Sequence, residues 1–274
     1  MTTKTSTYVL GNTQAEHERL ARQADRFDPL TERVFRDAGI GPGQRVLELG
    51  SGAGDVAMMV ARLVGPAGEV VGVERSADSI AHATGRVSAA GLKNVRFLQT
   101  DVAELSGERP FDAAVGRWIL MFVPDPVAVV RAASRLVRPG GSIAFHEVWW
   151  GPVLQTGAAL PVGSKALGLL HDTIVGAGAN PSMGPALRGV FRDAGLPEPT
   201  MRLEMMMEGD RECARWIVDT LQSVLPQADE SDPRLSALGD FETLPERIEA
   251  EIAAARSPAP WLAMVGAWAT KQTS

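Results

Sequence analysis

The stretch RVLELGSGAGD, residues 45–55, decides the fold predicted for this chain. Its apolar start indicates a buried strand that runs into a glycine-rich turn and then into a helix beginning at Asp55. Glycines at a turn let the backbone pass close to a ligand, and three at alternate positions leave a surface without side chains. These glycines are Gly50, Gly52 and Gly54. Glu48 places a carboxylate at the end of the strand, which suits a cationic ligand better than a pyrophosphate.

The same turn differs from the dinucleotide-binding pattern G-x-G-x-x-G. Asp55 stands where that pattern has its third glycine, and an Asp at a helix start would repel a phosphate. A nicotinamide-dependent oxidoreductase is therefore a disfavoured alternative. The turn alone is also compatible with an ordinary tight turn that binds nothing, so the prediction depends on the residues beyond Asp55.

Four further apolar runs, each suited to a strand, lie at 70–74, 95–101, 111–117 and 141–147. Helical stretches at 76–90 and 126–137 lie between them, the first opened by a serine cap and the second by an Asp-Pro pair. Strands that alternate with helices predict a parallel sheet with helices on both faces, which is a doubly wound α/β fold. Right-handed connections would place the carboxyl ends of the strands on one rim.

With these motifs in this order, the chain resembles the class I S-adenosylmethionine-dependent methyltransferases. VLELGSGAG at 46–54 is similar to their first motif, and Glu74 matches the acid that binds the ribose. QTDV at 99–102 matches the segment at the adenine. Matches to later motifs are FD at 111–112, GR at 116–117 and LVRPGGS at 136–142. The resemblance covers roughly 44–147 and is nearest the branch of ubiquinone and menaquinone biosynthesis and bacterial natural-product methyltransferases.

The resemblance implies a Rossmann-like, seven-stranded, mostly parallel sheet. Stretches 201–207 and 261–268 would be its sixth and seventh strands, the last one antiparallel. We expect four segments, namely an N-terminal helical lid (1–43), an S-adenosylmethionine-binding core (44–150), a helical cap insertion (151–196) and a C-terminal completion of the sheet with a helical insertion (197–274). Further helices are expected at 12–28, 29–38, 165–175, 185–194, 211–225 and 244–255. A leading helix that merely packs on the sheet is the alternative to a lid.

The cofactor implied by the resemblance is S-adenosyl-L-methionine, with S-adenosyl-L-homocysteine as product. Glu74 would accept hydrogen bonds from both ribose hydroxyls, and Asp101 one from the adenine amino group. Arg117 would lie near the methionine carboxylate or the methyl group. For Asp101 and Arg117 the alternatives are a helix cap and a surface salt bridge. The candidate cofactor-binding residues are Tyr8, Gln23, Glu48, Gly50, Gly52, Gly54, Glu74, Arg75, Asp101, Val102 and Arg117.

Methyl transfer requires mainly that the acceptor be aligned and water excluded, and a base only if the reacting atom is protonated. The candidate bases are His146, Glu147 and His171. We expect a small, partly apolar acceptor, because aromatic and Met residues come after the fourth and fifth strands. The candidate substrate-binding residues are Trp118, Met121, Trp149, Trp150 and His171. Packing between cap and core is the alternative for each, and O-, N- and C-methylation stay open.

Composition excludes several classes. A net charge of −6 disfavours a nucleic-acid surface. The sequence has no apolar run long enough for a membrane span and no secretion signal, and its single cysteine fits the cytosol. The four histidines are scattered, so no metal site is expected. We expect a cytoplasmic monomer or homodimer of secondary metabolism. A cyclase-like enzyme that binds S-adenosylmethionine without methylating, and a cofactor-sensing protein, remain alternatives.

Overall fold

The computed structural model describes residues 14–155, 160–208, 211–255 and 259–273. The chain folds into two compact units. The sheet unit holds Leu20–Trp149, Ser182–Glu204 and the residues from Ala263 onward. The helical unit holds Trp150–Pro181 and Met205–Leu262 together with Gln14–Arg19. None of the described helices is both long and apolar enough to cross a bilayer.

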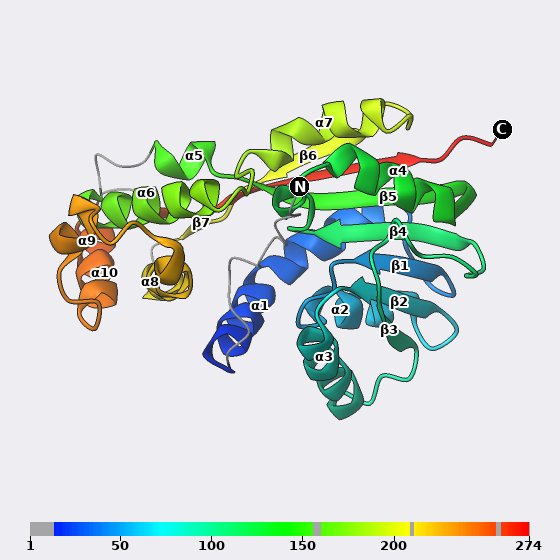
Figure 1. The fold of residues 1–274 in the computed structure, drawn as a ribbon, viewed down its shortest axis with the longest axis horizontal. Helices are drawn as coiled ribbons and strands as arrows, with labels where there is room; N and C mark the ends of the chain where they lie inside the picture. Colours follow the sequence, from blue (N-terminus) through cyan, green and yellow to red (C-terminus); the bar gives the residue numbers. More distant parts are fainter. Residues whose placement is uncertain (1–13, 156–159, 209–210, 256–258, 274) are drawn as a thin grey trace, which may run out of the picture. The chain divides into compact units, whose positions relative to one another are not determined.

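The sheet unit is built on a seven-stranded sheet in the order β3-β2-β1-β4-β5-β9-β6 (Figure 1). The first five of these strands are mutually parallel, whereas β9 is antiparallel to both β5 and β6. The strands are β1 Arg45–Leu49, β2 Glu69–Glu74, β3 Val95–Gln99, β4 Phe111–Arg117, β5 Val137–Trp149, β6 Thr200–Glu204 and β9 Ala263–Thr270. The predicted doubly wound, mostly parallel seven-stranded sheet is confirmed.

Helices cover both faces of this sheet, because successive side chains of a strand point to opposite sides. Ala144 of β5 joins an apolar cluster with Val34 of α1 and Val60 of α2. Its neighbour Phe145 makes an edge contact with Phe191 of α7 on the other side, with ring centroids 6.2 Å apart. The helices of the sheet unit are α1 Gln14–Asp37 from Leu20 onward, α2 Asp55–Val64, α3 Ala77–Ala89, η1 Leu120–Phe122, α4 Pro126–Leu136 and α7 Met183–Asp193.

The helical unit packs α6 against α8, α9 and α10. The Glu251 carboxylate of α10 accepts hydrogen bonds from the backbone N–H groups of Val162 and Gly163, which caps the first turn of α6. The elements of this unit are α5 Gly151–Leu154, α6 Pro161–Gly176, α8 Arg211–Val224, η3 Leu225–Gln227, α9 Pro233–Leu238 and α10 Leu244–Ala254, with the short strands β7 Met207–Glu208 and β8 Ala259–Pro260.

Three sequence expectations need correction. The two helices expected at 12–28 and 29–38 are one helix, α1, with Pro29 inside it. The strand expected at 201–207 ends at Glu204, since Met207 pairs with Pro260 in a separate two-stranded sheet. The expected cap of 151–196 and completion of 197–274 are each divided between the two units, because α7 packs on β5 and β9.

Candidate cofactor and acceptor site

The glycine turn after β1 has the backbone shape that only glycine adopts easily. Gly50, Gly52 and Gly54 have φ values of 66°, 49° and 82°. A Cβ added to Gly50 would lie 2.5 Å from Cδ1 of Ile119, and one added to Gly54 would lie 3.0 Å from Cβ of Ala83. A Cβ added to Gly52 would meet nothing within 4 Å. The turn is therefore packed from beneath and presents bare backbone at Gly52.

Glu74, at the end of β2, lies against this turn. One oxygen of its carboxylate accepts a hydrogen bond from Gly52 N at 3.1 Å, and the other accepts from Arg75 N at 2.7 Å and Ser76 N at 2.9 Å. The structure thus brings together the predicted acid and the predicted glycine turn. Arg75 contributes its backbone N–H, whereas its side chain is exposed.

Glu48 is buried at the end of β1, with 2% of its surface exposed. Burial raises the pKa of its carboxyl to about 7, opposed by Ser51 and Arg117. Its Oε2 atom makes no hydrogen bond to any described residue. A buried carboxylate oxygen without a donor favours a cationic partner, which is the ligand character that the sequence suggested for this position.

The other cofactor-binding candidates make fewer contacts that point to a ligand than Glu48 and Glu74 do. The Asp101 carboxylate accepts a hydrogen bond from Ala103 N at 2.9 Å within a turn, and since no helix begins there it is not the helix cap considered as the alternative. Val102 is buried beside it. Gln23 of α1 is buried in the same unit. Tyr8 lies outside the described residues.

Arg117 and His146 meet α1 through a chain of polar contacts. Arg117 Nη1 lies 2.7 Å from Asp28 Oδ1 and 3.2 Å from Thr31 Oγ1, which is 2.9 Å from His146 Nδ1. His146 is fully buried, and burial lowers its pKa to about 3, so its imidazole is neutral. Burial also raises the pKa of Asp28, although Arg117 opposes the shift. Arg117 thus forms a salt bridge with Asp28, but with a side chain only 9% exposed, so it is not the surface salt bridge considered as the alternative.

Glu147 is fully buried on the opposite face of β5. Its Oε1 accepts hydrogen bonds from Ile119 N and Leu120 N, both at 2.9 Å. Burial raises the pKa of its carboxyl to about 7 against these bonds. Alternation along β5 sends His146 and Glu147 to opposite faces of the sheet. Both are buried, because α1 covers one face of β5 and the turn after β4 covers the other.

That turn carries two of the acceptor candidates. Trp118 has φ 51°, the one positive value found for a non-glycine residue in the described chain. Its Nε1 lies 3.1 Å from Met264 Sδ, and its ring makes an edge contact with Phe27 at 5.0 Å. Met121 is buried in η1. Trp149, at the end of β5, is half-buried in the same unit.

Trp150 and His171 are brought together in the helical unit. Their ring centroids lie 5.8 Å apart, and His171 Nδ1 lies 2.9 Å from Asp172 Oδ1. Trp150 also neighbours Trp216, which neighbours Trp261. Trp150 is 3% exposed, so packing within this unit accounts for its position. The sequence analysis missed Trp216, although it lies on the apolar stripe of α8.

Sequence reasoning also missed Arg86. Its guanidinium donates to the carbonyl of Ala53 at 2.7 Å and to Asp55 Oδ1 at 2.6 Å. The Asp that replaces the third glycine of the dinucleotide pattern is thus held by a cation from α3. No sequence spacing rule connects these two residues, because the contact depends on how α3 packs.

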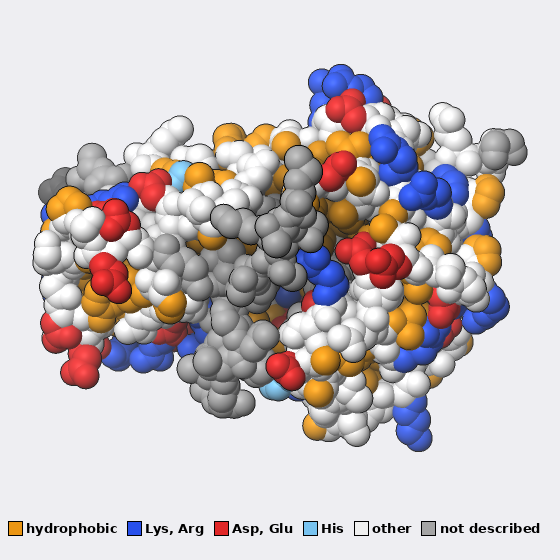
Figure 2. All heavy atoms as spheres, viewed as in Figure 1, with side chains coloured by type: hydrophobic (Ala, Val, Ile, Leu, Met, Phe, Trp, Pro, Cys, Tyr) orange, Lys and Arg blue, Asp and Glu red, His pale blue; other side chains and the backbone are white. Residues whose placement is uncertain are grey.

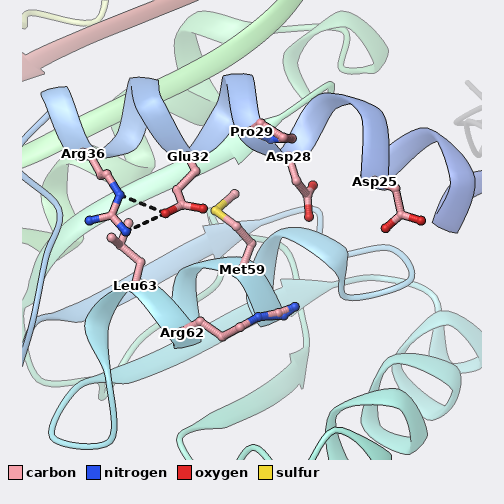
Figure 3. A pocket seen from close by; sticks show the side chains of 8 residues that line it. All are labelled: Asp25, Asp28, Pro29, Glu32, Arg36, Met59, Arg62 and Leu63. Carbon is pink, nitrogen blue, oxygen red and sulfur yellow. Dashed lines mark hydrogen bonds and ion pairs between the residues drawn. The ribbon is translucent and has the colours of Figure 1, made fainter.

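A groove of about 320 Å³ between α1 and α2 contains none of the predicted site residues (Figure 3). Its lining mixes acids with bases, and the Glu32 and Arg36 side chains are paired across one turn of α1. The face drawn in Figure 2 likewise intersperses acidic and basic side chains. The groove is lined by Asp25, Asp28, Pro29, Glu32, Arg36, Met59, Arg62 and Leu63.

Residues 40–171 match a family model described as "Methyltransferase domain". This stretch is therefore similar to a methyltransferase domain. The motifs in it point to the S-adenosylmethionine-dependent class, whose cofactor is S-adenosylmethionine. The bare glycine turn and the donorless Glu48 oxygen fit such a cofactor.

Two curated relatives match the domain in sequence. An arsenite methyltransferase of Aquipseudomonas alcaligenes is 34% identical over 115 residues, which are 39% of this chain and 33% of that protein. A demethylmenaquinone methyltransferase of Staphylococcus aureus is 31% identical over 117 residues, 42% of this chain and 48% of that protein. The chain therefore spans a third to about half of the length of these relatives.

Two solved structures resemble the fold. The YcgJ protein of Bacillus subtilis has a TM-score of 0.55 at 15% identity, and the match covers 91% of this chain and 100% of that protein. The [4+2]-cyclase SpnF has a TM-score of 0.56 at 22% identity, covering 90% and 82%. At these identities the likeness concerns the fold alone.

Proposed function

We propose that this protein transfers a methyl group from S-adenosylmethionine to a small, partly apolar molecule. The observation that carries the proposal is the rim of β1 and β2, where bare backbone at Gly52, the Glu74 carboxylate and the donorless oxygen of Glu48 lie together. Glu48 would face the cationic end of the cofactor, and Glu74 would accept from the ribose hydroxyls. When bound, the cofactor supplies a methyl group on a cationic sulfur.

The protein's own part in this reaction is to hold, orient and exclude water. The departing sulfur is already cationic and needs no acid. Among the candidate bases, His146 is neutral but enclosed, and Glu147 is engaged with two backbone N–H groups. His171, beside Asp172, is the candidate that is partly exposed. Alignment would carry the reaction if none of the three takes a proton.

The acceptor is proposed to be a natural product or a quinone-like molecule. The two curated relatives are named for acceptors as different as arsenite and demethylmenaquinone, so the shared domain does not select between them. Trp118 and Trp149, which are partly exposed in the sheet unit, would supply aromatic surface to the acceptor, whereas Met121 is buried there. We also propose that the protein acts in secondary metabolism, that it is located in the cytoplasm, and that it is a monomer or a homodimer.

A second candidate is a reaction without methyl transfer. The cyclase SpnF shares the fold, which supports keeping this alternative. A nicotinamide-dependent oxidoreductase is weaker, since Asp55 occupies the start of α2 where a pyrophosphate would need a glycine.

Calorimetry with S-adenosylhomocysteine and with NAD tests the cofactor. We expect micromolar binding of the first and no measurable binding of the second. Methyl-labelled S-adenosylmethionine, offered with quinone precursors, phenols and amines, then tests the reaction. Transfer of label to one of them supports methylation. A protein that binds S-adenosylhomocysteine but converts an acceptor without label transfer would favour the second candidate, and a protein that does not bind it would contradict both.

A further inference from the structure

The turn after β4 is held in a conformation that its own sequence disfavours. Trp118 has φ 51°, a region that bulky residues rarely enter. Such a backbone is strained and persists only where the surrounding structure enforces it. The contacts that enforce this turn therefore also shape the candidate site, because Trp118 and Arg117 are both candidate site residues.

The end of β5 enforces it with three consecutive hydrogen bonds. Trp118 N donates to the carbonyl of His146 at 3.2 Å, and Ile119 N and Leu120 N donate to Glu147 Oε1 at 2.9 Å each. The Glu147 side chain is fully buried. A carboxylate in that position satisfies two backbone donors that no strand or helix ladder reaches.

The side chain of Ile119 transmits this placement to the glycine turn. Ile119 fills the space that a side chain at either of two glycines would need. A Cβ on Gly50 would lie 2.5 Å from Ile119 Cδ1, and a Cβ on Gly116 would lie 2.7 Å from Ile119 Cγ2. Gly50 begins the turn whose Gly52 N–H bonds to Glu74. Ile119 thus packs against Gly50, at the start of the glycine turn.

We propose that Glu147 is a positioning residue. It fixes the backbone of Ile119, and the side chain of Ile119 in turn holds the Gly50–Gly54 turn in the shape that receives the cofactor. The inference rests on the proposed function, since it takes this turn as the S-adenosylmethionine site. It gives Glu147 a role that does not involve accepting a proton from the substrate.

The test is a double-mutant cycle on S-adenosylhomocysteine binding, measured by calorimetry. Glu147→Leu removes the acceptor at similar size and should weaken binding about 10-fold or more, while Glu147→Gln keeps an acceptor oxygen and should stay within about 3-fold. Ile119→Ala should also weaken binding. Because Glu147 acts through Ile119, the double variant should bind no more weakly than the worse single variant.

Hydrogen exchange without ligand gives a second readout. The Ile119 and Leu120 amides should exchange about 100-fold faster in Glu147→Leu than in the wild type, and at the wild-type rate in Glu147→Gln. If Glu147→Leu does not fold, Glu147→Asp, whose shorter side chain withdraws the carboxylate, replaces it in both measurements.

Three results would overturn the inference. They are a folded Glu147 variant that binds with wild-type affinity, additive effects in the cycle, and unchanged exchange at Ile119 and Leu120. If the wild type binds no S-adenosylhomocysteine, the proposed function fails instead, and exchange alone decides whether Glu147 holds the turn.

Discussion

Glu74 combines two tasks in one carboxylate. It accepts hydrogen bonds from Gly52, Arg75 and Ser76, and it is the predicted acceptor for the ribose hydroxyls. Glu74→Gln keeps the size and one acceptor oxygen but loses the charge and the paired acceptance. We expect it to weaken binding of S-adenosylhomocysteine about 10- to 100-fold in calorimetry. Glu74→Asp keeps the charge and serves as control, and affinity within 2-fold in Glu74→Gln would contradict the assignment.

Burial of titratable groups makes stability depend on pH in two opposite ways. Burial lowers the pKa of His146 from 6.5 to about 3, so between these values the unfolded chain binds more protons and stability rises with pH. Burial raises the pKa of Glu147 from 4.5 to about 7, so over that range the folded chain binds more protons and stability falls as pH rises. Glu48 acts in the same direction as Glu147.

Glu147→Gln isolates one of these contributions. The variant cannot ionise at this position, so its stability relative to the wild type should increase as the pH rises from 5 to 7, by about 2 kcal/mol. Urea unfolding at each pH measures it, with Glu242→Gln as an exposed control. A difference between variant and wild type that is constant across this range would show that the Glu147 carboxyl does not titrate there.

At this scale the sequence predicted the contacts that follow from the order of the parallel strands. The glycine turn after β1 and the acid at the end of β2 meet because parallel strands end on one rim. Asp28, Thr31 and Arg86 were missed, since each acts from a helix whose rotation and packing decide which residue it touches. Both His146 and Glu147 proved buried, because alternation along β5 says nothing about what covers each face.

At the scale of elements, α1 is the clearest departure from the sequence prediction. Pro29 indicated a boundary, yet the helix continues from Gln14 to Asp37. Pro29 cannot donate to the carbonyl of Asp25, but the buried residues Phe27, Leu30 and Val34 continue the apolar stripe on both sides of it. Tertiary packing on the sheet thus outweighs one lost hydrogen bond. The strands were easier to predict, since each combines an apolar run with a turn signal.

Pro29→Ala should therefore stabilise the protein. Pro29 is exposed inside a helix, where proline costs roughly 3 kcal/mol relative to alanine, and part of the gain is offset by a less restricted unfolded chain. We expect a net increase of about 1–2 kcal/mol in thermal or urea unfolding. Pro126→Ala is the matched control, since Pro126 occupies the first turn of α4, where proline is tolerated. An unchanged or lower stability for Pro29→Ala would show that Pro29 supports the bend or packing of α1.

At the scale of the whole molecule, the described cofactor candidates all belong to the sheet unit, from Gln23 to Arg117. Ligand binding stabilises what it binds by RT ln(1 + [L]/Kd), about 2.7 kcal/mol at 100 times Kd. S-adenosylhomocysteine at that concentration should slow exchange of the most protected amides of β1 and β4 up to about 100-fold. Amides buried in α6, α8 and α10 should change far less. In Glu74→Gln at the same ligand concentration the slowing should shrink in proportion to the lost affinity. Equal slowing of amide exchange in both units would mean that they unfold as one cooperative body. Slowing confined to the helical unit would contradict the assignment of the cofactor site to the sheet unit.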